Sequence, residues 1–146
     1  GVKIELIVRG ICCLKTGLPK LSEHISVRSI VGNFLEHARI FCFANGGREE
    51  IYMGSADWMP RNLDRRVEIL FPVEDENLKK KVRHVLEVQL ADTAKAHILQ
   101  SNGSYEKVGH RGKVLLNSQE QFCKEAIEEG KNINKEIPSR VFQPME

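Results

Sequence analysis

The sequence predicts an α/β domain in which helices pack on a β-sheet, and three observations indicate this class. Runs of β-branched and aromatic residues, which favour strands, recur along the chain up to Pro72. After Pro72 the apolar residues recur instead at the spacing of about 3.6 that is typical of an amphipathic helix. The composition, with 41% apolar and 29% charged residues among 146, fits one globular domain with one sizeable core.

The first predicted strand covers residues 2–8 (VKIELIV) and ends at Arg9. Ligands collect at strand ends in open α/β sheets, so this arginine is a candidate ligand contact. Residues 12–22 carry glycine, proline and scattered lysines and predict a loop. Residues 24–31 (HISVRSIV) alternate well enough to predict a second strand. Residues 32–36 suffice for only about one helical turn.

A β-hairpin is the clearest local prediction. Residues 38–43 (ARIFCF) and 50–53 (EIYM) are its predicted arms, joined across Asn45-Gly46-Gly47. Asn and Gly accept the positive φ angles that tight hairpin turns require. Residues 65–72 (RRVEILFP) predict the last strand, and their continuous apolar stretch favours a central position in the sheet.

Two helices are predicted after the strands. Apolar residues between Leu78 and Leu90 form one stripe with Asp75 as a candidate N-cap, and this helix is expected to cover one face of the sheet. Residues 92–112 are polar and contain helix breakers, which predicts a loop.

The second helix is predicted to start at a capping box formed by Ser118 and Gln121 and to stop at Gly130. The predicted organisation is therefore a domain over residues 1–112, its C-terminal helix over 113–130, and a tail over 131–146 that is expected to fray.

The composition excludes some classes of function. A net charge of +2 does not supply the broad positive field of a sequence-independent nucleic-acid binder, so any anion site must be local. The four cysteines lack a CxxC pair or a zinc spacing and are expected to be reduced thiols. No metal site is predicted. The chain lacks an initiator Met and opens directly on a strand pattern, as a piece of a longer polypeptide would.

Residues 32–68 hold the candidate chemistry. His37 and Arg39 are two positions apart, which places both side chains on the same face of a strand. Phospholipase D-type enzymes arrange a phosphate-attacking histidine with a His-x-Lys spacing and a later small-residue turn; here Arg39 takes the Lys position and residues 54–57 (GSAD) take the turn. Three arginines follow, at Arg61, Arg65 and Arg66. Because an imidazole can exchange a proton near neutral pH and guanidinium forks hold phosphoryl oxygens, we expect a phosphate-handling site.

Each of these residues also has an ordinary structural explanation. A single histidine near a strand end is more often packed or solvent-exposed, and the three arginines have acidic neighbours that offset them. Arg9 has no acidic residue within six positions on its C-terminal side, which favours a functional role. Trp58 is either a stacking platform or a core or rim residue.

Three long strings in the sequence resemble the C-terminal domain of the polyphosphate kinase family. They are residues 7–14 (IVRGICCL), 29–43 (SIVGNFLEHARIFCF) and 54–68 (GSADWMPRNLDRRVE), and the resemblance covers roughly residues 2–112. It implies a phospholipase D-like fold, with a mixed β-sheet flanked by helices, as a single C-terminal domain of a larger enzyme. Lys15-Thr16 and Asn33 depart from the family pattern and are given no phosphate contact.

The resemblance also implies a function. Enzymes of this family reversibly transfer the terminal phosphate of ATP to inorganic polyphosphate through a phosphohistidine, which lies in a preceding domain that this sequence does not contain. By this resemblance Arg9, His37 and Arg66 would contact nucleotide or polyphosphate phosphates. His37 would also be the catalytic histidine that this domain contributes. ATP or ADP is the expected substrate, and Mg²⁺ is expected in the full-length enzyme, bound by the absent domain.

Partners and alternatives follow from the same resemblance. The expected partners are ATP or ADP, polyphosphate and the preceding domain, in a homo-oligomeric full-length enzyme, with no nucleic acid. The expected location is the cytoplasm, with peripheral membrane association of the full-length enzyme as an alternative. By itself the chain is expected to be inactive. Two alternative hypotheses stay open. One is a phospholipase D-like phosphodiesterase that uses His37 directly, and the other is a non-catalytic module that binds polyphosphate or nucleotide.

Overall fold

The computed structural model describes residues 1–109, 112 and 114–133, and it confirms the α/β class. The three α-helices of this part are α1 (Pro60–Arg65), α2 (Glu76–Leu90) and α3 (Ser118–Ile133). Its seven strands are β1 (Ile4–Ile7), β2 (Ile25–Ile30), β3 (Ile40–Phe43), β4 (Glu50–Gly54), β5 (Leu70–Pro72), β6 (Ala96–Leu99) and β7 (Tyr105–Lys107).

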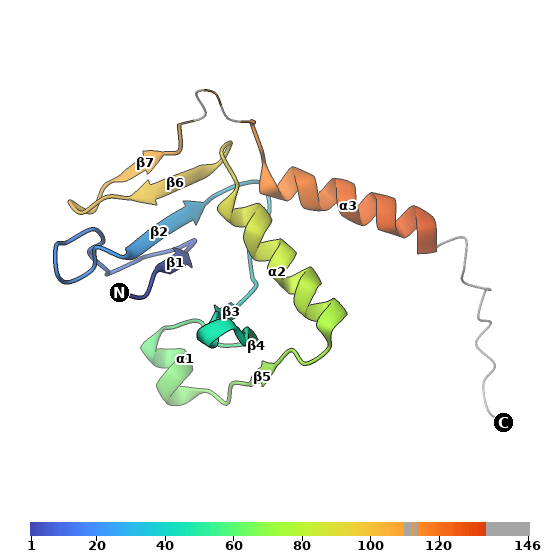
Figure 1. Cartoon of the computed structure of the whole chain (residues 1–146), viewed down its shortest axis with the longest axis horizontal. Coiled ribbons are helices and arrows are strands. Elements are labelled where there is room, and N and C mark those ends of the chain that lie inside the picture. The colour runs from blue at the N-terminus through green and yellow to red at the C-terminus, as the bar shows by residue number, and fades with distance from the viewer. Residues whose placement is uncertain (110–111, 113, 134–146) are drawn as a thin grey trace.

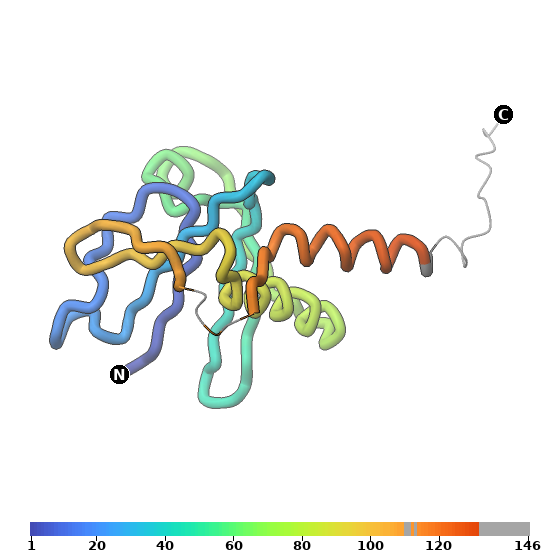
Figure 2. The backbone as a smooth tube through the Cα atoms, turned by 90° about the horizontal axis from the view of Figure 1, so that it is seen from above, coloured from blue at the N-terminus to red at the C-terminus, as the bar shows by residue number. Residues whose placement is uncertain are grey.

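The strands are divided between two sheets. The first has the order β1-β2-β6-β7 and is mixed, because β1 and β2 are parallel whereas the other neighbours are antiparallel. The second is the antiparallel sheet β3-β4-β5. Figure 1 shows α2 running from the side of the second sheet towards the first, and α3 extends away from the other elements in both Figure 1 and Figure 2.

The core consists of small and branched apolar side chains on strands of both sheets and on α2. Val27 on β2, Ala96 on β6 and Ile51 on β4 are almost completely inaccessible to solvent. Val88 on α2 is also buried, and this helix therefore contributes to the core, as its apolar stripe predicts.

Two local predictions are confirmed. The hairpin forms from β3 and β4, with Ile40 opposite Met53, and its connection contains Asn45, Gly46 and Gly47 at positive φ. Asp75 is the N-cap of α2, since its Oδ1 accepts hydrogen bonds from the backbone N–H groups of Asn77 and Leu78, both at 2.9 Å.

The prediction of a central strand over residues 65–72 was wrong. Only Leu70–Pro72 forms a strand, and this strand lies at the edge of the second sheet. Of the preceding residues, Arg65 ends α1, which has Pro60 in its first turn, a position that favours helix initiation, and residues 66–69 form neither helix nor strand. Leu70 and Phe71 remain exposed, so the apolar run did not indicate burial inside a sheet.

The predicted loop over residues 92–112 was also wrong, because it contains β6 and β7. β6 pairs with β2, 66 or more residues earlier in the chain, and β7 pairs with β6. Only four and three residues form these strands, too few for a local sequence pattern to indicate them.

The second predicted helix exists, but its ends differ from the prediction. Ser118 is already helical and its hydroxyl donates to Asp92, so Ser118 and Gln121 do not form a capping box. The helix also passes Gly130 and continues to Ile133, since glycine weakens a helix without always ending it. The tail after residue 133 and His110 lie outside the described residues. No helix of the described part has the length and apolar content to cross a bilayer.

Candidate active site

The segment before β3 carries His37 and lies against the end of β1. A terminal nitrogen of the Arg9 guanidinium donates to the backbone carbonyl of Glu36, the residue directly before His37. β1 and β3 belong to different sheets. Arg9, which follows a strand of the first sheet, therefore lies beside the segment of His37, which precedes the second sheet.

Arg39 joins His37 to the turn after β4. Its Nη1 contacts His37 Nδ1 at 2.5 Å and also donates to the His37 carbonyl at 2.8 Å. Its Nε and Nη2 face the two carboxylate oxygens of Asp57, at 3.1 and 3.0 Å. Such a two-point guanidinium–carboxylate pair has a defined geometry, so Arg39 is fixed from both directions.

The electrostatics of Asp57 reflect the surrounding cations. The hydrogen bond from Arg39 lowers the pKa of the Asp57 carboxyl, partial burial opposes this, and the charges of Arg39, Arg9 and His37 lower the pKa further. Asp57 is therefore ionised near neutral pH. It is the one acidic side chain paired with Arg39 in the described residues.

Two buried glutamines support the His37 segment from the helices. Gln119 on α3 accepts from the Phe34 N–H at 3.0 Å and donates to the Phe34 carbonyl at 2.8 Å, as a neighbouring strand would. Its Nε2 also lies 2.9 Å from Glu36 Oε1, and Gln89 on α2 donates to Glu36 Oε2 at 3.3 Å. A Cβ atom at Gly32 would overlap Gln119, so glycine makes room for this amide.

Sequence reasoning missed this support. Glutamine is common on helix surfaces and has no spacing that distinguishes a buried amide from an exposed one. Gly32 offered the sole local signal, since a glycine beside a strand end can mark a close approach of another group.

Ser55 closes the turn that carries Asp57. Its hydroxyl donates to the Glu68 carboxylate and accepts from the backbone N–H of Ile69 at 3.0 Å. The turn over residues 54–57 is thus hydrogen-bonded to the segment that leads into β5. These bonds restrain the backbone that carries Asp57.

Arg66 is not joined to the cluster by any contact of the described residues. It follows α1 as the C-cap residue with extended backbone angles, and its side chain is exposed. Arg61 and Arg65 are exposed on α1 as well. The structure therefore brings Arg9 next to the His37 segment and adds Arg39 and Asp57, whereas Arg66 makes no hydrogen bond or ion pair with them within the described residues.

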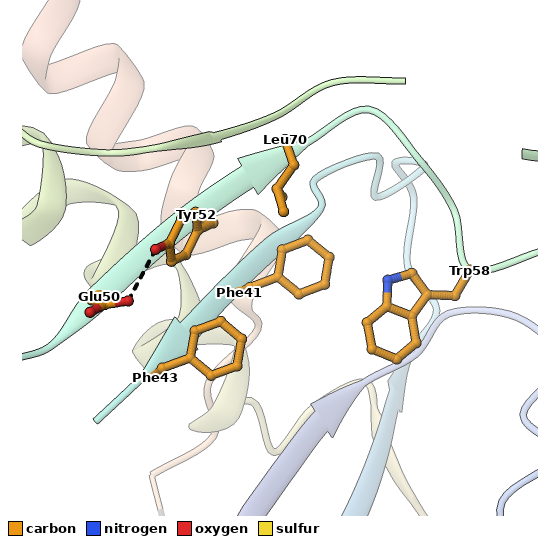
Figure 3. A pocket seen from close by; sticks show the side chains of 6 residues that line it. All are labelled: Phe41, Phe43, Glu50, Tyr52, Trp58 and Leu70. Atoms are coloured by element: carbon orange, nitrogen blue, oxygen red, sulfur yellow. Dashed lines mark hydrogen bonds between the residues drawn. The ribbon is translucent and has the colours of Figure 1, made fainter. Parts of the chain in front are cut away.

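An aromatic hollow lies on the same hairpin. It has a volume of about 440 Å³ and is lined by residues of β3, β4 and β5 together with Trp58. Figure 3 shows Trp58 facing Phe41, and their rings stack with centroids 5.8 Å apart. Tyr52 donates to Glu50 at 3.0 Å, and this hydrogen bond raises the pKa of the Tyr52 phenol.

The residues that the structure describes do not fit a Mg²⁺ site. Magnesium prefers carboxylate oxygens and waters in octahedral geometry. Within residues 1–109, 112 and 114–133, no three His, Cys, Asp or Glu side chains converge in a way that could hold a metal ion.

Comparison with known proteins gives consistent matches. The family model described as polyphosphate kinase C-terminal domain 2 matches residues 1–119. The chain is 54% identical to a polyphosphate kinase of Pseudomonas aeruginosa over 112 residues, covering 77% of this chain and 16% of that protein. It is 53% identical to polyphosphate kinase 1 of Chlorobaculum tepidum over 131 residues, covering 90% of this chain and 19% of that protein.

A solved structure agrees with the sequence matches. The crystal structure of polyphosphate kinase from Porphyromonas gingivalis superposes with a TM-score of 0.83 at 39% identity, over 90% of this chain and 20% of that chain. The chain thus spans about a fifth or less of the length of these relatives. Since the family model covers most of its length, the chain belongs to the polyphosphate kinase family, as a C-terminal domain 2.

Proposed function

We propose that this chain is the C-terminal catalytic portion of a polyphosphate kinase that reversibly transfers the terminal phosphate of ATP to inorganic polyphosphate. The names of its relatives support the reaction class. One observation supports the role of this domain above all: Arg9 contacts the His37 segment. There the guanidinium groups of Arg9 and Arg39 and the imidazole of His37 lie near the carboxylate of Asp57.

Such a cluster suits phosphoryl transfer. The transferred group carries charge on its oxygens, and stabilising that charge is the main catalytic requirement. Arg9 holds phosphoryl oxygens, and His37 donates a hydrogen bond or a proton to the transferring group. Arg66, the exposed C-cap residue of α1, contacts the phosphate chain.

The rest of the polypeptide supplies the remaining parts. The chain spans 16–19% of two curated relatives. In this proposal the phosphohistidine that divides the transfer into two steps belongs to a part of the polypeptide outside this chain. Mg²⁺ would be bound by that other part of the polypeptide, where it would neutralise charge on the nucleotide phosphates.

The test is substitution in the full polyphosphate kinase polypeptide. His37→Ala is expected to lower the rate of polyphosphate synthesis by ~10²–10⁴-fold, the usual effect of losing a proton-transferring group. Arg9→Ala is expected to lower it by about 10²–10³-fold, as for the loss of one group that stabilises transition-state charge. Arg48→Ala is the control, since Arg48 is an exposed arginine of the hairpin loop. Circular dichroism checks that the variants fold. Near-normal synthesis by both His37→Ala and Arg9→Ala would contradict the assigned roles.

For the 146-residue chain alone, we propose binding of ATP or polyphosphate without turnover. The reason is that the chain holds cations for an anion but not the phosphorylated histidine. Calorimetric titration with polyphosphate, compared between the chain and its Arg9→Ala variant, measures this binding.

A phosphodiesterase that uses His37 directly is the alternative function. Release of nucleotides from DNA by the chain alone would favour it.

A further inference from the structure

Arg39 is placed to control His37. Its side chain is only 16% exposed, whereas His37 is exposed. One nitrogen, Nη1, contacts both the imidazole Nδ1 and the carbonyl of the same residue, at 2.5 and 2.8 Å. The guanidinium therefore fixes the ring relative to its own backbone and limits rotation about the two side-chain torsions of His37.

The contact also determines which ring nitrogen carries the proton. A guanidinium has only donors, so Nδ1 must accept and can carry no proton while the contact exists. The proton of the neutral imidazole then lies on Nε2. Nε2 makes no hydrogen bond within the described residues, and it belongs to an exposed side chain.

Asp57 holds Arg39 in the orientation that this requires. Its carboxylate occupies Nε and Nη2, which leaves Nη1 for the histidine. Asp57 lies on the turn after β4, and Arg39 directly precedes β3. The pair therefore spans the open end of the hairpin, where the Gly54 N–H also donates to the Arg39 carbonyl at 3.0 Å.

We propose that Arg39 is the positioning residue of His37, oriented in turn by Asp57, and that it makes His37 a donor through Nε2 rather than a nucleophile. A nitrogen that bears a proton has no lone pair with which to attack phosphorus, and Nδ1 is occupied by Arg39. The catalytic meaning of this arrangement rests on the proposed function, whereas the geometric claim does not.

The first experiment is a double-mutant cycle in the full polyphosphate kinase polypeptide. Arg39→Met is expected to lower kcat roughly 10- to 100-fold, as for groups that orient metal-bound histidines. Arg39→Lys, which keeps the charge without the fork, should fail to restore it. In a His37→Ala background, Arg39→Met should cause little further loss, because its effect passes through the imidazole. Arg48→Met serves as the matched control and should leave activity unchanged.

The second experiment reads the imidazole directly. In ¹⁵N-labelled 146-residue chain, the Nδ1 resonance of His37 should show the shift of a hydrogen-bonded, unprotonated nitrogen. Arg39→Met and Asp57→Asn should both move it towards the shift of a free, unprotonated nitrogen, while Arg48→Met should not.

The outcomes separate the two proposals. If His37→Ala retains near-normal activity, the proposed function of His37 fails, although the Nδ1 shift can still support the contact. If His37→Ala keeps only a small residual rate, and Arg39→Met lowers that residual rate as much as it lowers the wild-type rate and leaves the Nδ1 resonance unmoved, then Arg39 acts independently and the positioning role is overturned.

Discussion

Asp92 shows how one buried residue joins three elements. Its side chain is fully inaccessible, and its carboxylate accepts hydrogen bonds from the N–H groups of Lys95 and Ala96 and from both the N–H and the hydroxyl of Ser118. Burial acts to raise the pKa of Asp92, but these hydrogen bonds outweigh it and the pKa is lowered overall. The carboxylate thereby ties the end of α2 to the start of β6 and to the N-terminus of α3.

Asp92→Asn is expected to destabilise the chain by about 1–3 kcal/mol at neutral pH, because the amide group must direct a donor at other donors. The sign of the pH dependence follows from the lowered pKa. The ionised carboxylate stabilises the fold above the pKa of the unfolded state, and this contribution is lost as the pH falls through the lower pKa of the folded state.

Urea unfolding at neutral pH and at successively lower acid pH measures this effect. The difference in unfolding free energy between wild type and Asp92→Asn should become smaller as the pH falls. Asp64→Asn, at an exposed position on α1, is the control. A difference that stays constant down to the lowest pH would show that the charge of Asp92 is unimportant.

At the scale of elements, α3 acts as a support for the His37 segment. Gln119 pairs with both backbone groups of Phe34, and Gln119 and Gln89 together hold Glu36. Arg9, which precedes Glu36 in the chain whereas both glutamines follow it, donates to the Glu36 backbone carbonyl. The position of His37 therefore depends on a helix that begins 81 residues after it, at Ser118.

Gln119→Leu is expected to leave the Phe34 N–H and carbonyl unpaired, at a cost of about 1–3 kcal/mol. Hydrogen exchange of the Phe34 amide should accelerate, and kcat of the full polypeptide should fall more than KM rises, since the loss affects positioning rather than charge. Gly32→Ala should act in the same way and add little to Gln119→Leu, because both displace one amide.

The control is Gln121→Leu on the same helix, which removes only a hydrogen bond to Glu125. If Gln121→Leu lowers kcat as much as Gln119→Leu does, the effect comes from destabilisation of α3 as a whole. It would then not come from loss of the two hydrogen bonds between Gln119 and Phe34.

At the scale of the whole molecule, the second sheet exposes an apolar face. Trp58, Phe43 and Leu70 are 77%, 53% and 64% exposed around the aromatic hollow in Figure 3. Contiguous apolar surface of this kind is unusual on a monomeric soluble protein and promotes association. The chain alone is therefore expected to associate as its concentration rises.

Sedimentation of the chain over a range of concentrations tests this. Phe43→Ser combined with Leu70→Ser should reduce association with little loss of stability, because both side chains are already exposed. Leu115→Ser, at an exposed position before α3, is the comparison. Unchanged association of the double variant would show that another surface is responsible.

The sequence determined the features that depend on neighbouring residues. The hairpin follows from Asn45 and two glycines between alternating arms, and the start of α2 follows from Asp75, because both signals act within a few residues. Family membership was likewise readable, since it rests on linear strings of residues. The sequence also made Arg9 and His37 candidates through their places beside strand ends.

The tertiary structure alone decided how distant segments meet. β6 forms because β2 pairs with it, and the His37 segment is held by Gln119 on α3. Arg39 became the partner of His37 and Asp57 only when the hairpin brought the turn after β4 back to it. Each of these contacts depends on chain closure over many residues, which no local pattern of residues encodes.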